Sequence, residues 1–227
     1  MKNINEYKKD EFYAQFYNSD LCKQIKKDFD ILSWEKYYQR DFILTPRQII
    51  GEIQKQSTVF SMVPLYYINY LLEKNPKEIY DIGCGWNIFK KYIPNIIGVG
   101  AEELNTEHFF GDIHDVWDSD FVYHHNEFYE SIFSINALHF RPIDDLRKVV
   151  NEFASVIQKG GRGFLALNLA RMVERAVDDK FFQIKFDFDK YIRNELKDVG
   201  FKYIVFDVDV TIYDESLDGN IRLVIEK

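Results

Sequence analysis

A glycine turn at residues 81–87 is the feature that most constrains the fold of this chain. The apolar run 77–82 ends at Asp81-Ile82-Gly83-Cys84-Gly85, and a helix-compatible segment follows from Ile88. The order of strand, glycine turn and helix brings backbone N–H groups close to a bound ligand, and a side chain at either glycine would block a nucleotide or ribose. Ordinary tight turns also use two glycines, so the meaning of this turn depends on the fold around it.

Composition bounds the class of protein. The 227 residues suffice for one domain with a sizeable core and a small appendage. The formal net charge of −8 gives no overall attraction to phosphate backbones, which argues against a nucleic-acid partner. Only two cysteines occur, Cys22 and Cys84, and no apolar run reaches membrane-spanning length. We therefore expect a soluble cytoplasmic protein without a membrane partner.

The hydrophobic pattern alternates between strands and helices after residue 60. Strands are predicted at residues 78–82, 95–100, 108–111, 130–136 and 163–169, and helices at 61–74, 143–157 and 188–199. The step Lys159-Gly160-Gly161 is predicted to end the second of these helices. Residues 115–127 read as a polar loop. Two last strands, 203–213 and 221–225, have no room for a helix between them and should pair as an antiparallel hairpin.

This order predicts an α/β protein with a doubly wound, mostly parallel seven-stranded sheet that ends in an antiparallel β-hairpin. Residues 101–107 are too few for a full helical crossover, so the second crossover is abbreviated. We divide the chain into a Rossmann-like core, 61–227, and an N-terminal helical extension, 1–60. Phe12 and Phe16 recur at helical spacing in this extension, which either packs on the core or forms a lid over a substrate site.

Five motifs follow one another in a fixed order. They are Asp81-Ile82-Gly83-Cys84-Gly85, Gly111-Asp112-Ile113, Ser134-Ile135-Asn136, Lys159-Gly160-Gly161 and the closing hairpin. With these motifs, residues 61–227 resemble the class I S-adenosylmethionine-dependent methyltransferases. Each motif is weak alone, and the resemblance depends on their order. It implies S-adenosylmethionine as the cofactor and methyl transfer as the reaction.

The resemblance also implies a role for each site residue. Asp81 would accept hydrogen bonds from the methionyl ammonium group, and Ser134 would lie near the methyl group. Asp112 would accept a hydrogen bond from the adenine amine while the Ile113 N–H donates to the ring. The backbone of the turn would pass close to the cofactor's carboxylate and ribose at Gly83, Cys84, Gly85 and Trp86. Together these groups would form a crevice beyond the carboxyl ends of the strands.

Two departures from the family pattern concern the same site. Asn87 stands where the third glycine of the first motif is expected, and asparagine tolerates the left-handed region. Gly100 stands where the second strand normally ends in an acid that binds both ribose hydroxyls. Glu102 or Glu103 could reach back to that position, and we favour Glu102. If neither does, the affinity for the cofactor falls.

The sequence says less about the identity of the methyl acceptor than about the identity of the cofactor. Residues 134–137 lack the Pro-Pro and Pro-Cys sequences that the resemblance associates with methylation of DNA bases. We therefore expect a small-molecule acceptor, or a protein or glycan side chain that enters the site as a small group. Because methyl transfer from an activated sulfonium mainly requires alignment of the nucleophile, no dedicated catalytic residue is required. His139 is the one candidate for a general base. The sequence specifies neither the methylated atom nor the oligomeric state.

The sequence alone leaves other functions open. The missing ribose acid also suits a non-catalytic methyltransferase-like module that binds a partner through the N-terminal helices. The closing hairpin and the Lys-Gly-Gly step argue against an NAD-type Rossmann domain. His108, His114, His124 and His125 match no familiar ligand spacing, so we expect no metal site. The aromatic residues that either line a substrate site or pack in the core are Trp86, Trp117, Phe121 and Tyr123.

Overall fold

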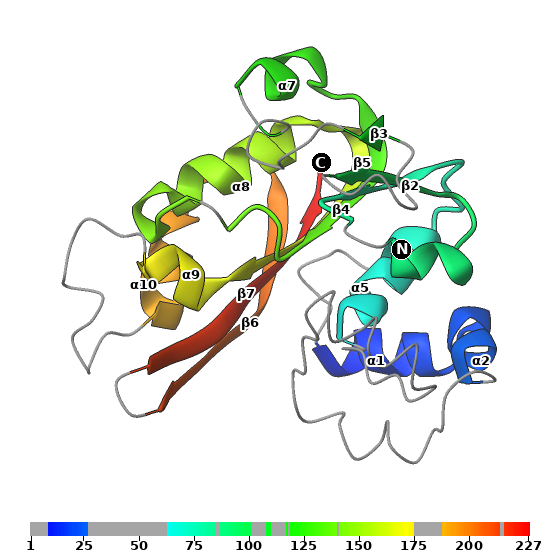
Figure 1. The fold of residues 1–227 in the computed structure, drawn as a ribbon, viewed down its shortest axis with the longest axis horizontal. Helices are drawn as coiled ribbons and strands as arrows, with labels where there is room; N and C mark the ends of the chain where they lie inside the picture. The colour runs from blue at the N-terminus through cyan, green and yellow to red at the C-terminus, as the bar shows by residue number, and fades with distance from the viewer. Residues whose placement is uncertain are drawn as a thin grey trace.

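A computed structural model gives the fold shown in Figure 1. The structure describes residues 9–26, 63–84, 87–100, 108–109, 117, 119–139, 141–174, 188–213 and 216–227. Within these residues no helix is long and apolar enough to cross a membrane. The predicted α/β class with a mostly parallel sheet is confirmed.

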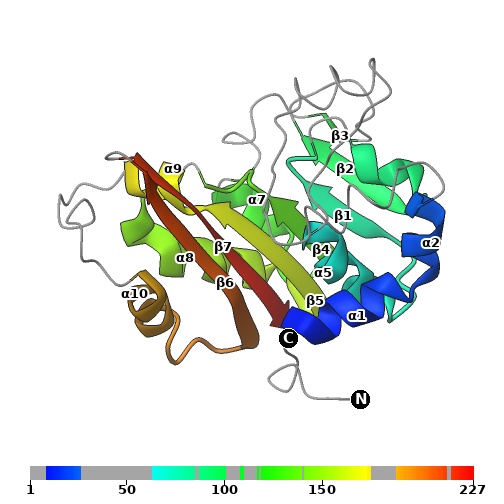
Figure 2. The same ribbon diagram turned by 90° about the horizontal axis from the view of Figure 1, so that it is seen from below.

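The strands form one sheet in the order β3-β2-β1-β4-β5-β7-β6. Their bounds are β1 (Ile79–Ile82), β2 (Ile96–Gly100), β3 (His108–Phe109), β4 (Tyr129–Ile135), β5 (Ile157–Asn168), β6 (Lys202–Tyr213) and β7 (Ser216–Glu226). Strands β1 to β5 pair in parallel, whereas β7 is antiparallel to both β5 and β6. The long closing hairpin is visible beside β5 in Figure 2. The predicted antiparallel ending is therefore confirmed.

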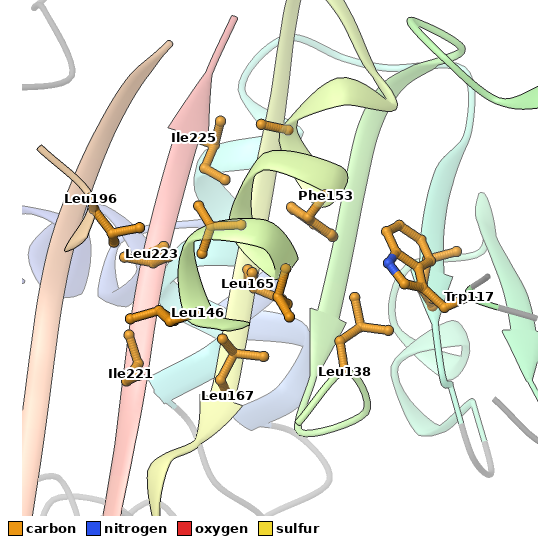
Figure 3. Close-up of a cluster of buried hydrophobic side chains, with 14 of the residues drawn as sticks. Trp117, Leu138, Leu146, Phe153, Leu165, Leu167, Leu196, Ile221, Leu223 and Ile225 are labelled. Atoms are coloured by element: carbon orange, nitrogen blue, oxygen red, sulfur yellow. The ribbon is translucent and has the colours of Figure 1, made fainter. Parts of the chain in front are cut away.

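One face of the sheet is covered by α8 (Leu146–Ser155). This helix is strongly amphipathic, and Leu146, Val150 and Phe153 are buried on its inner side. Figure 3 shows Leu146 and Phe153 among β5 and β7 side chains, with Trp117 at the edge of the same cluster. The helices α9 (Leu169–Glu174) and α10 (Phe188–Glu195) contribute Leu169, Met172 and Ile192 to this cluster.

The opposite face is covered by α5 (Val63–Leu72) and α1 (Lys9–Tyr17), which is followed by α2 (Asp20–Lys26). Tyr67 of α5 stacks on Phe164 of β5 with ring centroids 4.6 Å apart. Phe12 of α1 packs against Tyr67 and Tyr70 at centroid distances of 5.6 and 5.1 Å. The described part of the predicted extension therefore lies in the same buried cluster as the sheet, and the rest of it lies outside the described residues.

A buried arginine ties this helical layer to the sheet. Arg162 of β5 is 2% exposed, and its guanidinium lies 3.8 Å from the centre of the Tyr70 ring. Its Nη1 donates to the Tyr70 carbonyl at 2.8 Å and to Glu73 Oε2 at 3.2 Å. A buried charge is tolerated only when it is paired and hydrogen-bonded, and these contacts supply both conditions.

Several element boundaries differ from the sequence predictions. The segment 119–124 is a helix, α7 (Ser119–His124), although a loop was predicted. The helix α8 ends at Ser155, so Ile157 and the Lys159-Gly160-Gly161 step belong to β5 and not to a helix end. Tyr129 pairs with Ile157 and Ser131 pairs with Arg162, so residues 158–161 form a bulge opposite Glu130. Gly160, at φ 78°, supplies the left-handed conformation within this bulge.

Two further differences lie near the end of the chain. The short helix α9 was not predicted, and β7 begins at Ser216, five residues before the predicted strand. The register of β6 against β7 extends to the pair Tyr213 and Ser216, so residues 216–220, which lie between the two predicted strands, belong to β7. The connection between β2 and β3 is abbreviated as expected, because Val99 already pairs with His108. Residues 101–107 between them lie outside the described residues.

Candidate functional site

The order of the strands reverses between β1 and β4. From β1 the chain first adds β2 and β3 on one side, and then crosses to the other side to add β4 and β5. In open α/β sheets, ligands bind beyond the carboxyl ends of the strands at such a switch point. Asp81 and the glycine turn lie at the carboxyl end of β1, and Ser134 lies near the end of β4. These residues therefore form the candidate ligand site of the fold.

The turn after β1 folds back onto β2. The N–H groups of Gly83 and Cys84 both donate to the Val99 carbonyl, at 2.7 and 3.2 Å. Gly83 has φ 76°, a conformation that a side chain would strain, which explains the glycine. Asn87, at φ 48°, closes the turn by donating its N–H to the Cys84 carbonyl at 2.8 Å. The 3₁₀ helix η2 (Ile88–Lys91) starts there, so a single helical turn replaces the predicted helical segment.

The side chains of this turn pack directly on the backbone of β2. A Cβ atom at Gly98 would lie 2.5 Å from Asn87 Nδ2 and 2.9 Å from Cys84 Sγ. A side chain at position 98 would therefore displace the side chains of Asn87 and Cys84. Gly98 was not among the predicted site residues, although the two glycines in Gly98-Val99-Gly100 are unusual inside a strand.

Gly100 lies next to the same turn. A Cβ atom at this position would stand 3.4 Å from both the N and Sγ atoms of Cys84, an ordinary contact distance. The position at which the resemblance expects a ribose-binding acid therefore faces the glycine turn. Glu102 and Glu103, the residues suggested to replace that acid, lie outside the described residues.

Asp81 is a buried carboxyl group between the two halves of the sheet. It pairs in register with Gly98 of β2 and Phe133 of β4, and it is 3% exposed. Desolvation by burial raises its pKa well above the ordinary value for an aspartate. A cationic ligand at this place would stabilise the ionised form and reverse that shift. The site is therefore suited to the ammonium end of a ligand.

Ser134 connects the ends of β4 and β1. Its side chain is fully buried, and Oγ donates to the Ile82 carbonyl at 2.9 Å. The hydroxyl proton is thus used within the protein, and the oxygen lone pairs are what Ser134 retains for a ligand. The contact fixes the position of β4 at the switch point.

The turn after β4 contains two further polar residues. Asn136 adopts φ 52° and donates its N–H to the Ala166 carbonyl of β5 at 2.8 Å. Its side-chain Oδ1 and Nδ2 are both buried, and neither has a hydrogen-bond partner among the described residues. His139 is half-buried in the same turn, next to the core residue Leu138. The sequence analysis quoted Asn136 only as part of a motif, because nothing in the sequence marks its amide as unpaired.

The remaining predicted site residues lie outside the described residues. They are Gly85, Trp86, Glu102, Asp112 and Ile113. Of the aromatic candidates, Trp117 is 1% exposed and packs against Phe121 and Phe153 in the core. Tyr123 is 78% exposed. Cys22 and Cys84 form no disulfide.

His125 packs against aromatic rings and lies within hydrogen-bond distance of a backbone carbonyl. His125 stacks on Phe121 at a centroid distance of 4.0 Å and on Tyr129 at 5.7 Å. Its Nδ1 lies 2.8 Å from the Phe121 carbonyl oxygen. Among the described residues, no group of three or more His, Cys, Asp or Glu side chains could hold a metal ion. His114 lies outside these residues.

The fold defines a class of protein, the open α/β sheets with a ligand site at the switch point, but comparisons with known proteins go little further. No family model matches the chain, and no curated protein matches it in sequence. Its fold is similar to that of a SAM-dependent methyltransferase from Archaeoglobus fulgidus, with 11% identity, coverage of 86% of this chain and 100% of the other, and a TM-score of 0.43.

A SAM-dependent methyltransferase from Thermotoga maritima shows 15% identity, coverage of 80% of this chain and 97% of the other, and a TM-score of 0.40. A protein studied for the conversion of a disulfide bond into a thioacetal group during echinomycin biosynthesis shows 15% identity, coverage of 71% and 80%, and a TM-score of 0.41. These likenesses are too distant to carry a function over to this chain.

Proposed function

We propose that this protein is an S-adenosylmethionine-dependent methyltransferase that acts on a small-molecule acceptor. The observation that carries the proposal is the glycine turn at the switch point, with the buried Asp81 beside it and Gly98 beneath it. The five ordered motifs and the antiparallel ending of the sheet support the same family. A cytoplasmic location is part of the proposal, since the two cysteines form no disulfide.

The described residues are compatible with this cofactor. S-adenosylmethionine carries an ammonium group and a sulfonium group, and the desolvated Asp81 carboxyl lacks the compensating charge that such a cation provides. The absence of side chains at Gly83 and Gly98 keeps the turn close to β2. In the proposal, Asp81 accepts from the ammonium group, and the backbone of Gly83, Cys84, Gly85 and Trp86 lies along the carboxylate and ribose.

The other end of the cofactor is assigned to residues outside the described part. Asp112 accepts from the adenine amine, the Ile113 N–H donates to the ring, and Glu102 binds the ribose hydroxyls. When bound, the cofactor supplies an activated methyl group. The protein then has to align the acceptor in line with that methyl group and exclude water. Ser134 fixes the end of β4 for this purpose, and His139 is the candidate proton acceptor.

Isothermal titration calorimetry with S-adenosylmethionine tests the proposal. We expect one binding site per chain and a loss of about tenfold or more in affinity for Asp112→Ala, because a hydrogen bond to a charged group contributes about 1.5–3 kcal/mol. Asp198→Asn, which removes a surface charge after α10 and keeps the left-handed backbone at φ 62° accessible, is the control and should leave the affinity unchanged. Absence of binding in a folded sample would reject the enzyme and leave the partner-binding module as the better hypothesis.

A further inference from the structure

Two asparagines flank the carboxyl end of β5. Asn136 follows β4 on one side of β5, and its N–H donates to the Ala166 carbonyl at 2.8 Å. Asn220 belongs to β7 on the other side and pairs in register with Asn168, the last residue of β5. Since neighbouring strands lie about 5 Å apart, the two asparagines are separated by about 10 Å. This distance is within the span of a small organic molecule.

Both asparagines have buried polar atoms without partners. Asn220 is 7% exposed, and its Oδ1 has no hydrogen-bond partner among the described residues. The Oδ1 and Nδ2 atoms of Asn136 are likewise buried without a hydrogen-bond partner among the described residues. Each unmade buried hydrogen bond costs about 1–3 kcal/mol, so such groups need an explanation in a native protein.

Asn168 provides a contrast within the same row of residues. Its Oδ1 accepts from the Arg171 N–H at 2.9 Å and thereby caps the helix α9. The residue that lies between the two unpaired asparagines is therefore used in folding. Polar side chains at this edge of the sheet therefore do not all lack hydrogen-bond partners.

The unpaired atoms indicate the chemistry of their ligand. Two of the three are oxygens, which accept hydrogen bonds, and the third is the Nδ2 of Asn136, which donates. A ligand that satisfies both oxygens must present N–H or O–H groups. A molecule with amine or hydroxyl groups does so, whereas a molecule without either group leaves both oxygens unpaired.

We infer that Asn136 and Asn220 form the acceptor subsite and that the acceptor is a small molecule methylated on an amine or hydroxyl group. The inference rests on the proposed function. The lone pair of the acceptor nitrogen or oxygen forms the bond to the methyl carbon. The carbon–sulfur bond breaks with its electron pair on sulfur, and the acceptor's proton passes to His139, the proton acceptor of the proposed function. One of the two amide oxygens accepts from the N–H or O–H of the reacting group and so directs its lone pair. The other accepts from a second N–H or O–H group of the same molecule.

Thermal unfolding separates this subsite from a structural role without any ligand. Asn220→Leu removes a buried side chain whose Oδ1 has no hydrogen-bond partner among the described residues, and it should leave the Tm unchanged or raised. The matched control Asn168→Leu removes the cap of α9 and should lower the Tm by a few degrees, since a cap contributes about 1 kcal/mol. Asn136→Gly, which keeps the left-handed backbone available, should also leave the Tm unchanged. Equal losses for Asn220→Leu and Asn168→Leu would overturn the inference.

Methyl transfer gives the second readout. The wild-type protein is incubated with S-adenosylmethionine labelled with ¹³C at the methyl group and with a cell extract of small molecules. The ¹³C chemical shift of the product should show a methyl group on nitrogen or oxygen. Asn220→Leu and Asn136→Gly should lose transfer by about tenfold each while retaining the affinity for S-adenosylmethionine, because each loses one hydrogen bond to the acceptor.

The outcomes distinguish this inference from the proposed function. A product methylated on carbon or sulfur, or full transfer by both variants, would overturn the acceptor subsite and leave the methyltransferase proposal intact. Binding of S-adenosylmethionine without transfer to any amine or hydroxyl compound would do the same. Absence of cofactor binding would instead reject the proposed function itself.

Discussion

Asp81 shows at the scale of one residue how the burial of a carboxyl group can cost stability. Burial raises the pKa of Asp81 well above its ordinary value, so the folded chain binds a proton in a pH range in which the unfolded chain has lost it. The free energy of unfolding therefore falls as pH rises from the ordinary aspartate pKa, about 3.9, through the raised one. A bound cation would remove this penalty.

Asp81→Asn should consequently stabilise the protein without ligand at neutral pH. We expect its Tm to exceed that of the wild type near pH 7 and to approach it below about pH 4, where the aspartate is protonated in both states. Thermal unfolding across this pH range measures the difference. The same variant should bind S-adenosylmethionine more weakly, because it loses the charge that attracts the ammonium group. Parallel pH profiles for the two proteins would contradict the first expectation.

Gly100 offers a test of the missing ribose acid. Because a Cβ atom fits there at 3.4 Å from Cys84, Gly100→Asp should fold and direct a carboxylate toward the turn. We expect the affinity for S-adenosylmethionine to rise by about tenfold, the effect of one charge-assisted hydrogen bond. Gly100→Asn is the neutral control and should gain less. An equal affinity for Asp and Asn at this position would argue that another residue already binds the ribose.

At the scale of secondary structure, Gly163 of β5 permits the close approach of α8. A Cβ atom there would lie 2.6 Å from Ile157 Cδ1 and 2.8 Å from Phe153 Cε1. Gly163→Ala should therefore lower the free energy of unfolding by about 1–3 kcal/mol through overpacking. Chemical denaturation measures this loss. Gly200→Ala, where nothing lies within 4 Å of the added carbon, is the control and should change stability little. Equal effects would show that backbone entropy, and not packing, decides the outcome.

The elements themselves were predictable where one physical signal dominated. The amphipathic rhythm of α8 and the apolar strands β1 and β2 follow from hydrophobic periodicity, as does the closing hairpin. The boundary between α8 and β5 was not predictable, because Lys159-Gly160-Gly161 has the composition of a helix end and serves as a β-bulge. Glycine in the left-handed region suits both uses, and only the pairing with β4 decides between them.

The candidate site also contains residues that the sequence predicts and residues that only the folded chain reveals. Asp81, Gly83 and Cys84 could be selected from the sequence, because a glycine turn after a strand has a local signature. Gly98 could not, because its role depends on the Asn87 and Cys84 side chains that pack against it from another segment. The unpaired side-chain atoms of Asn136 and Asn220 could not be predicted from the sequence either, since burial and the absence of hydrogen-bond partners are properties of the folded chain.

At the scale of the whole molecule, the central question is whether α1 is part of the core or a lid. Phe12 and Phe16 are fully buried, and Phe12 contacts Tyr67, which itself stacks on Phe164 of the sheet. The contacts thus run from α1 through α5 to β5. A lid that opens to admit substrate would have to break this aromatic packing, so the described part of α1 is expected to unfold together with the sheet.

Phe12→Ala tests this coupling. Truncation of a buried phenylalanine costs about 3–5 kcal/mol, which for a chain of this size corresponds to a decrease in Tm of about 10 °C. We expect calorimetry to show one transition, shifted as a whole, because α1 shares its hydrophobic cluster with the sheet. Tyr17→Ala, at a side chain that is 39% exposed at the end of the same helix, should shift it far less. A second transition at low temperature, with the main one unmoved, would show that α1 unfolds independently and would restore the lid hypothesis.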